Sequence, residues 1–205
     1  QKDTKERVSN IIVMGMGEPL DNYEELLRFI KLVSCEKGIG ISQRNITVST
    51  CGLVDKIRML ADEKLQITLA ISLHAPNDEI RRQTMPIANR YTIGEIIQAC
   101  KYYFDKTGRR ITFEYSMIRG VNDKEEHAKE LAGRLSGLNC HINLIPLNEV
   151  KERNCYRSTK EDIEKFKTIL EKYRKTVTIR REMGSDIDAA CGQLRKKFLT
   201  KNGRN

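Results

Sequence analysis

Short apolar strand patterns alternate with amphipathic helical patterns along most of the chain, and this alternation restricts the possible folds more than any other feature. Residues 9–15 form an apolar run that ends in glycine, and residues 22–36 then carry leucine, isoleucine and valine at helical spacing. Further strands are expected at residues 44–50, 66–74, 109–118, 141–147 and 176–182, and further helices at 53–64, 92–104, 122–135 and 158–175.

This order of elements predicts an α/β fold in which helical crossovers join the strands of a parallel sheet. The strands read as apolar on both faces, which is typical of a parallel sheet covered on both sides. Residues 75–91 form a longer connection with a helical turn, and Asn122 or Asp123 is expected to cap the helix that follows. The periodicity leaves two architectures open: a doubly wound open sheet, and a complete or partial (β/α) barrel.

Composition narrows the class of protein. The chain has 205 residues, of which 39% are hydrophobic, and this suits one folded domain. No apolar stretch approaches the roughly 20 residues that cross a membrane, and the charged N-terminus lacks the apolar core of a secretory signal. These features predict a soluble, cytoplasmic protein with no membrane partner. The formal net charge of +9 favours polyanionic partners, nucleic acid first.

The cysteines give no sign of a disulfide framework or a metal site. They stand at positions 35, 51, 100, 140, 155 and 191, and no two of them form a CxxC or CxxxC motif. In a chain of this size with no export signal, most are expected to be reduced. Cys100 lies on an apolar helical stripe and is expected to be a small buried hydrophobe.

Small and polar residues follow several of the expected strands. In a parallel α/β fold the loops after the strands form one functional rim, so these residues could converge on a single polar ligand. A glycine lets a ligand approach the backbone, and Glu18 offers a carboxylate to a cation such as an α-ammonium group. The candidate rim residues are Gly17, Glu18, Ser49, Ser72, Leu73, His74 and Asn148.

Each rim residue also has a purely structural interpretation. The glycines of the GMGEP segment can form only a tight turn. Ser49 can be a strand residue with a satisfied hydroxyl, and His74 can be a core histidine bonded to a backbone carbonyl. Asn148 can cap the turn after Pro146. Cys191 can fill a gap beside small alanines, or it can lie in the first turn of a helix, where the helix dipole favours a thiolate.

The motifs GMGEPL, STCGL, SLHAP, RRQTMPI, LIPLN and GSDIDAACGQL occur in this order between Ile11 and Leu194. Together they resemble the radical S-adenosylmethionine (SAM) adenine-C2 methyltransferases of 23S rRNA and tRNA, and their C8-methylating antibiotic-resistance relative. The resemblance implies a partial (β/α)6 radical SAM barrel that lacks its first strand and cluster loop, with helices outside a parallel sheet. It therefore favours the barrel over the doubly wound sheet.

The resemblance also implies roles for the rim residues. Gly17 and Glu18 match the motif that holds the methionyl amino group of S-adenosylmethionine, and Ser49 matches a ribose or carboxylate contact. The other positions that match cofactor contacts are Ser72, Leu73, His74 and Asn148.

The implied reaction is methylation of adenine C2 through a methyl-cysteine intermediate, with Cys191 as the methyl carrier. In that family one S-adenosylmethionine methylates the cysteine, and a second is cleaved at a [4Fe–4S] cluster to a radical that activates the methyl group. Radical chemistry is needed because adenine C2 is a poor nucleophile. The implied partners are 23S rRNA, tRNA and an electron donor such as flavodoxin or ferredoxin.

The chain departs from that family in one respect, because it contains no CxxxCxxC cluster-binding motif. A [4Fe–4S] cluster needs several closely placed thiolates. We therefore expect a fragment that is inactive alone, with residues 1–10 as the remnant of a preceding segment and 11–175 as the partial barrel. Residues 176–205 would then hold the last strand and the segment with the methyl-accepting cysteine. The missing strand would leave a sheet edge open to self-association.

Paired basic residues are candidates for RNA contact, and Arg180–Arg181, next to the Cys191 segment, come first. The other basic clusters are Arg81–Arg82, Arg109–Arg110 and residues 195–197. Three alternative functions stay open. They are C8 methylation of adenine, a non-catalytic half-barrel that binds RNA or a ligand, and an ordinary (β/α) enzyme acting on a phosphorylated metabolite.

Overall fold

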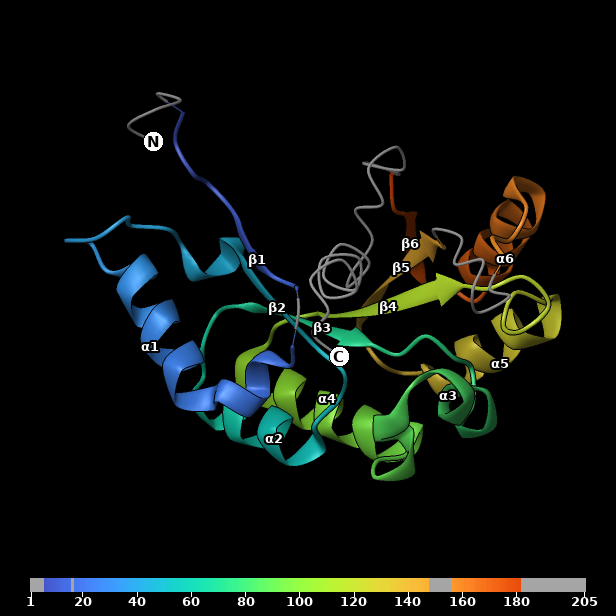
Figure 1. Ribbon diagram of the computed structural model, residues 1–205, viewed down its shortest axis with the longest axis horizontal. Coiled ribbons are helices and arrows are strands. Elements are labelled where there is room, and N and C mark those ends of the chain that lie inside the picture. The colour runs from blue at the N-terminus through green and yellow to red at the C-terminus, as the bar shows by residue number, and fades with distance from the viewer. Residues whose placement is uncertain (1–5, 16, 148–155, 182–205) are drawn as a thin grey trace, which may run out of the picture.

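The fold is a six-stranded parallel sheet whose strands are neighbours in the same order as in the chain (Figure 1). The computed structural model describes residues 6–15, 17–147 and 156–181. Every pairing between neighbouring strands is parallel. The strands are β1 (Ile11–Val13), β2 (Ile46–Thr50), β3 (Thr68–Ser72), β4 (Ile111–Met117), β5 (Cys140–Pro146) and β6 (Thr176–Ile179).

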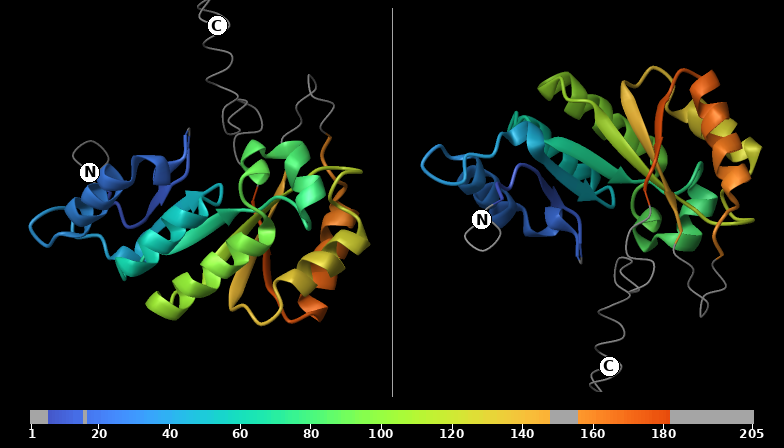
Figure 2. Two further views of the ribbon diagram at one scale, coloured as in Figure 1. Left: turned by 90° about the horizontal axis from the view of Figure 1, so that it is seen from below. Right: turned by 90° about the horizontal axis from the view of Figure 1, so that it is seen from above.

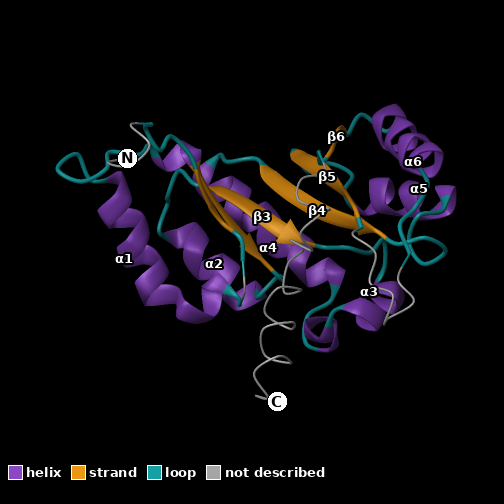
Figure 3. Ribbon diagram, turned by 45° about the horizontal axis from the view of Figure 1, so that its top comes forward, coloured by secondary structure: helices purple, strands orange, loops and turns teal. Residues whose placement is uncertain are grey.

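The helices lie on one face of this sheet, as Figures 1 and 3 show for α1, α2 and α4. Crossovers between parallel strands are right-handed, so a strand order that never reverses places every crossover helix on the same side. This order excludes the doubly wound sheet and confirms the partial barrel. The helices are α1 (Tyr23–Ser34), α2 (Val54–Asp62), α3 (Asp78–Thr84), α4 (Ile93–Thr107), α5 (Glu125–Arg134) and α6 (Lys160–Lys172).

The sheet is curved, and the helices follow one another around its outside (Figure 2). A contact between the two edge strands reflects this curvature. Arg180, directly after β6, donates from Nη1 to the Sδ of Met14, directly after β1, at 3.8 Å. Four strands separate these edges in the sheet order, so the carboxyl ends of the strands curl toward one another.

The outer face of the sheet packs against the helices and forms the hydrophobic core. Phe113 and Tyr115 of β4 are almost fully buried there, and Tyr115 stacks on Phe166 of α6 with ring centroids 5.2 Å apart. The prediction of strands that are apolar on both faces is wrong. The other strand positions form an inner face that is mostly polar: Ile12, Thr47, Ser49, Thr68, Ala70, Ser72, Thr112, Glu114, Ser116, His141, Asn143, Ile145, Thr176 and Thr178.

Side-chain caps mark the starts of α3, α4 and α6, but not those of α1 and α2. Thr92 and Glu95 form a capping box at the start of α4, and Gly108 ends that helix in the left-handed conformation. The prediction that Asn122 or Asp123 caps the next helix is wrong, because α5 begins at Glu125 with Lys124 as its N-cap. Among the described residues, no helix is long and apolar enough to cross a membrane.

Candidate functional site

The loop after β1 combines an open glycine with a carboxylate that ties two strands together. Gly17 has φ +102°, a conformation that favours glycine, and a Cβ placed there would meet no heavy atom within 4 Å. Glu18 accepts from the backbone N–H of Leu20 at 3.0 Å through Oε1 and from that of Cys51 at 2.7 Å through Oε2. Glu18 thus fixes its own loop to the end of β2, and with the Cys51 thiol as a third donor its carboxylate keeps one further lone pair.

Two of the predicted rim residues meet on a buried carboxylate that the sequence reading did not single out. The hydroxyl of Ser49 donates to Glu114 Oε2 at 2.9 Å, and the hydroxyl of Ser72 lies 3.5 Å from the same atom. Ser49 is on β2 and Glu114 on β4, so the Glu114 side chain passes over β3. The residue of β3 in register with Ser49 is Ala70, whose small side chain leaves that path open. Glu114 is 4% exposed, at the centre of the inner face.

His74 follows β3 in a strained backbone conformation that three hydrogen bonds hold in place. Its φ is +57°, which non-glycine residues rarely adopt. The backbone N–H of His74 donates to Glu114 O at 3.1 Å, and its carbonyl accepts from Asn122 Nδ2 at 2.8 Å. Ring Nδ1 accepts from the backbone N–H of Ser116 at 3.0 Å. The neutral ring therefore carries its proton on Nε2, which can donate to a ligand.

Burial, and secondarily the nearby Arg81 guanidinium, lower the pKa of His74 to about 4. A lowered pKa means that the folded state resists protonation, so between pH 6.5 and about 4 the unfolded state binds more protons. Stability from this group is present above pH 6.5 and is lost as the pH falls through that window.

The variant His74→Asn keeps an acceptor for Ser116 and tolerates the left-handed backbone. We expect the free energy of unfolding of the natural chain to fall more steeply than that of the variant, by up to about 1.4 kcal/mol per pH unit below pH 6.5. Urea unfolding between pH 4.5 and 7 measures this difference. Parallel pH profiles for the two proteins would contradict the lowered pKa of His74 in the folded state.

A buried guanidinium joins the ends of β2 and β3. Arg81 is 0% exposed and donates through Nη2 to Cys51 O at 2.6 Å and, at 3.5 Å, to Ser72 O. Its Nε donates to Leu73 O at 3.2 Å, and its Nη1 to Tyr91 O at 3.4 Å. These carbonyls supply the hydrogen bonds that the guanidinium group needs, because solvent cannot reach it. The prediction that Arg81 is a candidate RNA contact is therefore wrong, whereas its neighbour Arg82 is exposed.

The glycine after Cys51 is required by this packing. Gly52 has φ +101°, and a Cβ there would approach Ile96 Cδ1 to 2.8 Å and Arg81 Nη2 to 3.4 Å. Burial, followed by the hydrogen bond to Glu18, raises the pKa of the half-buried Cys51 thiol to about 12, so it is not a thiolate at neutral pH. Cys100 is fully buried, as predicted, and burial raises the pKa of its thiol.

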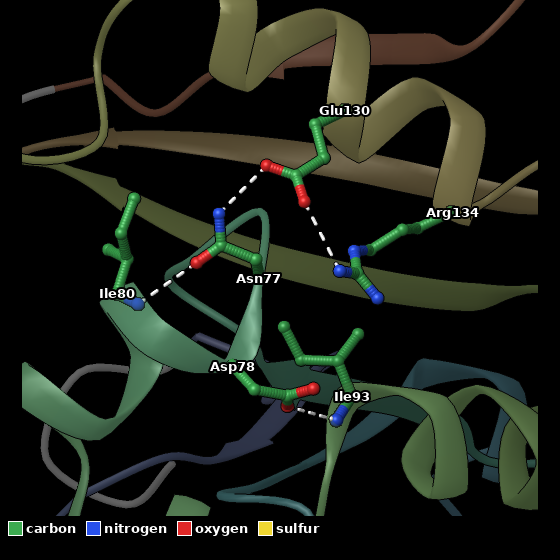
Figure 4. Close-up of polar contacts among 6 residues, drawn as sticks. All are labelled: Asn77, Asp78, Ile80, Ile93, Glu130 and Arg134. Carbon is green, nitrogen blue, oxygen red and sulfur yellow. Dashed lines mark hydrogen bonds and ion pairs between the residues drawn. The ribbon is translucent and has the colours of Figure 1, made fainter.

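The loop after β3 is also anchored from the outside, as Figure 4 shows. Asn77 Oδ1 accepts from the backbone N–H of Ile80 at 2.9 Å and so caps the start of α3. Its Nδ2 donates to Glu130 Oε2 on α5 at 2.8 Å, and Glu130 Oε1 pairs with Arg134 at 3.2 Å. These contacts hold the segment that carries Ser72, Leu73 and His74 against α5.

A second polar group on the inner face was not predicted. His141 Nε2 lies 2.9 Å from Thr178 Oγ1, which donates to Asn143 Oδ1 at 3.3 Å. The threonine has one proton, so the histidine must donate to it. Asn143 is in register with Glu114, and its amide Nδ2 donates to no described residue. Alternating polar residues in the strand sequences could have indicated this face.

The structure therefore brings Glu18, Ser49, Ser72 and His74 to one end of the sheet. Leu73 is buried in the core, and its carbonyl accepts from Arg81. Asn148 and Cys191 lie outside the described residues. No group of three or more His, Cys, Asp or Glu side chains that could hold a metal occurs in residues 6–15, 17–147 and 156–181.

Comparison with known proteins places this arrangement among radical SAM proteins. The family pattern described as the radical SAM superfamily matches residues 1–132. Relatives described as probable dual-specificity RNA methyltransferase RlmN are 62% identical over 199 residues in Lachnospira eligens and 57% identical over 202 residues in Clostridium novyi. These alignments cover 97% and 98% of this chain but only 57% and 59% of the relatives, so the chain spans little more than half of their length.

Solved structures agree with the fold. A crystal structure of a radical SAM methyltransferase from Sphaerobacter thermophilus is similar with a TM-score of 0.89 and 48% identity, covering 94% of this chain and 56% of that one. A domain of pyruvate-formate lyase-activating enzyme from Bacteroides vulgatus has a TM-score of 0.63 at 21% identity, over 85% of this chain and all of that domain. The second likeness concerns the fold alone.

Proposed function

Since the chain belongs to the radical SAM superfamily, we propose that it is the S-adenosylmethionine-binding part of an RNA methyltransferase. The proposed reaction is methylation of adenine C2 in 23S rRNA and tRNA through a methyl-cysteine at Cys191, in the cytoplasm, with a flavodoxin or ferredoxin as electron donor. Similarity to relatives named dual-specificity RNA methyltransferases supports the RNA substrate. Membership in the superfamily implies S-adenosylmethionine and a [4Fe–4S] cluster as cofactors.

The observation that carries the proposal is the convergence of polar groups at the carboxyl ends of β1 to β4. S-adenosylmethionine has an ammonium group and ribose hydroxyls that donate, and a carboxylate that accepts. The rim offers matching groups: acceptors on Glu18 and Ser49, and the Nε2–H of His74 as a donor. Open space beside Gly17 lets a ligand reach the backbone. When bound, S-adenosylmethionine supplies the methyl group and the radical.

The described residues do not fit the iron–sulfur cluster. Cys35 is exposed, Cys51 half-buried, and Cys100 and Cys140 are buried, and among the described residues no group of cysteines is assembled for metal binding. We propose that these 205 residues bind S-adenosylmethionine but do not methylate RNA on their own.

Two surface features extend the proposal. Arg180 and Arg181 are exposed at the end of β6, on the same rim as Glu18 and His74, and are our candidates for phosphate contacts. β1 pairs with β2 alone among the described residues, and its Ile12 is 63% exposed, so this edge is the proposed site of self-association. The boundaries after residues 10 and 175, which separate the preceding segment, the partial barrel and the C-terminal segment, stay a prediction.

The experiment that tests the function uses the protein expressed from its complete gene, with a reconstituted cluster, S-adenosylmethionine, a reductant and fragments of 23S rRNA and tRNA. We expect methyladenosine in both RNAs, and mass analysis with fragmentation of the base separates C2 from C8. Unmodified adenine in both RNAs with a fully loaded cluster would contradict the proposal. Methylation at C8 would instead assign to this protein the activity of the related C8-methylating resistance enzyme.

A further inference from the structure

Glu114 fixes the direction of two hydrogen bonds on the inner face. A serine hydroxyl has one proton to donate, and a carboxylate oxygen only accepts. Ser49 Oγ lies 2.9 Å from Glu114 Oε2, and Ser72 Oγ lies 3.5 Å from the same atom. Both serines therefore direct their protons to Glu114, and the lone pairs that remain can only accept from a ligand.

We propose that Glu114 is a positioning residue that makes Ser49 and Ser72 hydrogen-bond acceptors for the ribose hydroxyls of S-adenosylmethionine. This inference rests on the proposed function, and it deepens the assignment of that site. Two acceptors on neighbouring parts of the sheet suit a vicinal diol, because each ribose hydroxyl donates one proton. A ligand carboxylate would instead face oxygen lone pairs and the Glu114 charge, so the ribose is favoured over the carboxylate at Ser49.

The proton count supports the same assignment. The two ribose hydroxyls carry one proton each, and Ser49 and Ser72 offer one acceptor each beside the buried Glu114 carboxylate, which is 4% exposed. The other donor on the ligand, its α-ammonium group, is assigned by the proposed function to Glu18, whose loop lies against the end of β2.

The first test measures binding by titration calorimetry with S-adenosylmethionine, with its 2′-deoxy and 3′-deoxy analogues and with its decarboxylated analogue. We expect Glu114→Gln to weaken binding of S-adenosylmethionine about tenfold. The new amide N–H donates to one serine, whose own hydroxyl proton must then point away from residue 114 and toward the ligand. In this variant the deoxy analogue that lacks the hydroxyl facing the reversed serine should bind almost as well as S-adenosylmethionine, whereas the natural chain should lose about tenfold on removal of either hydroxyl. Removal of the ligand carboxylate should change both proteins by the same factor.

Glu171→Gln on α6 is the matched control, because it removes one exposed charge away from the inner face. It should bind every ligand as the natural chain does. Equal losses for the deoxy analogues in the natural chain and in Glu114→Gln would overturn the ribose assignment, as would unchanged binding of S-adenosylmethionine by Glu114→Gln.

A second, ligand-free measurement separates this inference from the proposed function. Unfolding constants of Ser49→Ala, Glu114→Gln and the double variant form a cycle. We expect the two changes to be non-additive by about fivefold to tenfold, because both alter the same hydrogen bond, which the Ser49 hydroxyl donates to a charged carboxylate oxygen. Additive effects would overturn the orientation of Ser49. If this cycle is non-additive but the natural chain binds no S-adenosylmethionine, the proposed function fails, and the ribose assignment fails with it.

Discussion

Cys191→Ala is expected to abolish RNA methylation by the enzyme expressed from its complete gene, while leaving the binding of S-adenosylmethionine unchanged. Under the proposed function the Cys191 thiol carries the methyl group, and alanine has no atom that can form or break that bond. Loss of a covalent carrier removes the reaction path itself rather than slowing one step. Methyladenosine formed in 23S rRNA fragments, quantified by mass spectrometry, measures the effect.

Cys35→Ala is the matched control for this prediction. Cys35 is an exposed thiol at the end of α1, so its removal should leave methylation at the natural level. Substantial turnover by Cys191→Ala would remove Cys191 from the reaction. A loss of turnover in both variants would indicate a general sensitivity to cysteine replacement rather than a specific carrier.

Arg81→Met is expected to have the largest effect on stability. The guanidinium donates to four backbone carbonyls from three segments of chain, and no water can replace it at a fully buried position. Methionine fills part of the volume but leaves those carbonyls without donors. Each unsatisfied buried group costs about 1–3 kcal/mol, and partial relaxation brings the expected total to about 4 kcal/mol.

The neighbouring residue provides the comparison for Arg81. Arg82 is exposed on the same helix, so Arg82→Met should change the free energy of unfolding by less than about 0.5 kcal/mol. Urea unfolding at pH 7 measures both variants. Similar small losses at the two positions would show that Arg81 does not hold the ends of β2 and β3 together.

Local sequence patterns were sufficient for the order of the elements. All six strands and the helices α1, α2, α4, α5 and α6 lie where the hydrophobic period predicts them, because each period depends on residues close in sequence, whereas α3 was expected only as a helical turn. The hydrophobic period could not decide between a barrel and a doubly wound sheet, because that choice depends on which strands pair. The continuous order β1 to β6 settles that choice in favour of the barrel.

The sequence was less informative about single polar residues. Arg81 reads as half of a basic surface pair, but carbonyls from Cys51 and Tyr91, distant in sequence, enclose it. Glu114 stands in a β-rich run, and only the alternation Thr112, Glu114, Ser116 indicates a polar inner face. Such residues acquire their roles from groups that folding brings together.

Transfer of an isotopically labelled methyl group tests the methyl-carrier assignment most directly. The complete enzyme would be incubated with S-adenosylmethionine that carries a deuterated methyl group, then digested and analysed by peptide mass spectrometry. The proposed function predicts the label on the peptide that contains Cys191 before RNA is added, and its appearance at adenine C2 afterwards. Labelled RNA without any methylation of Cys191 would contradict it.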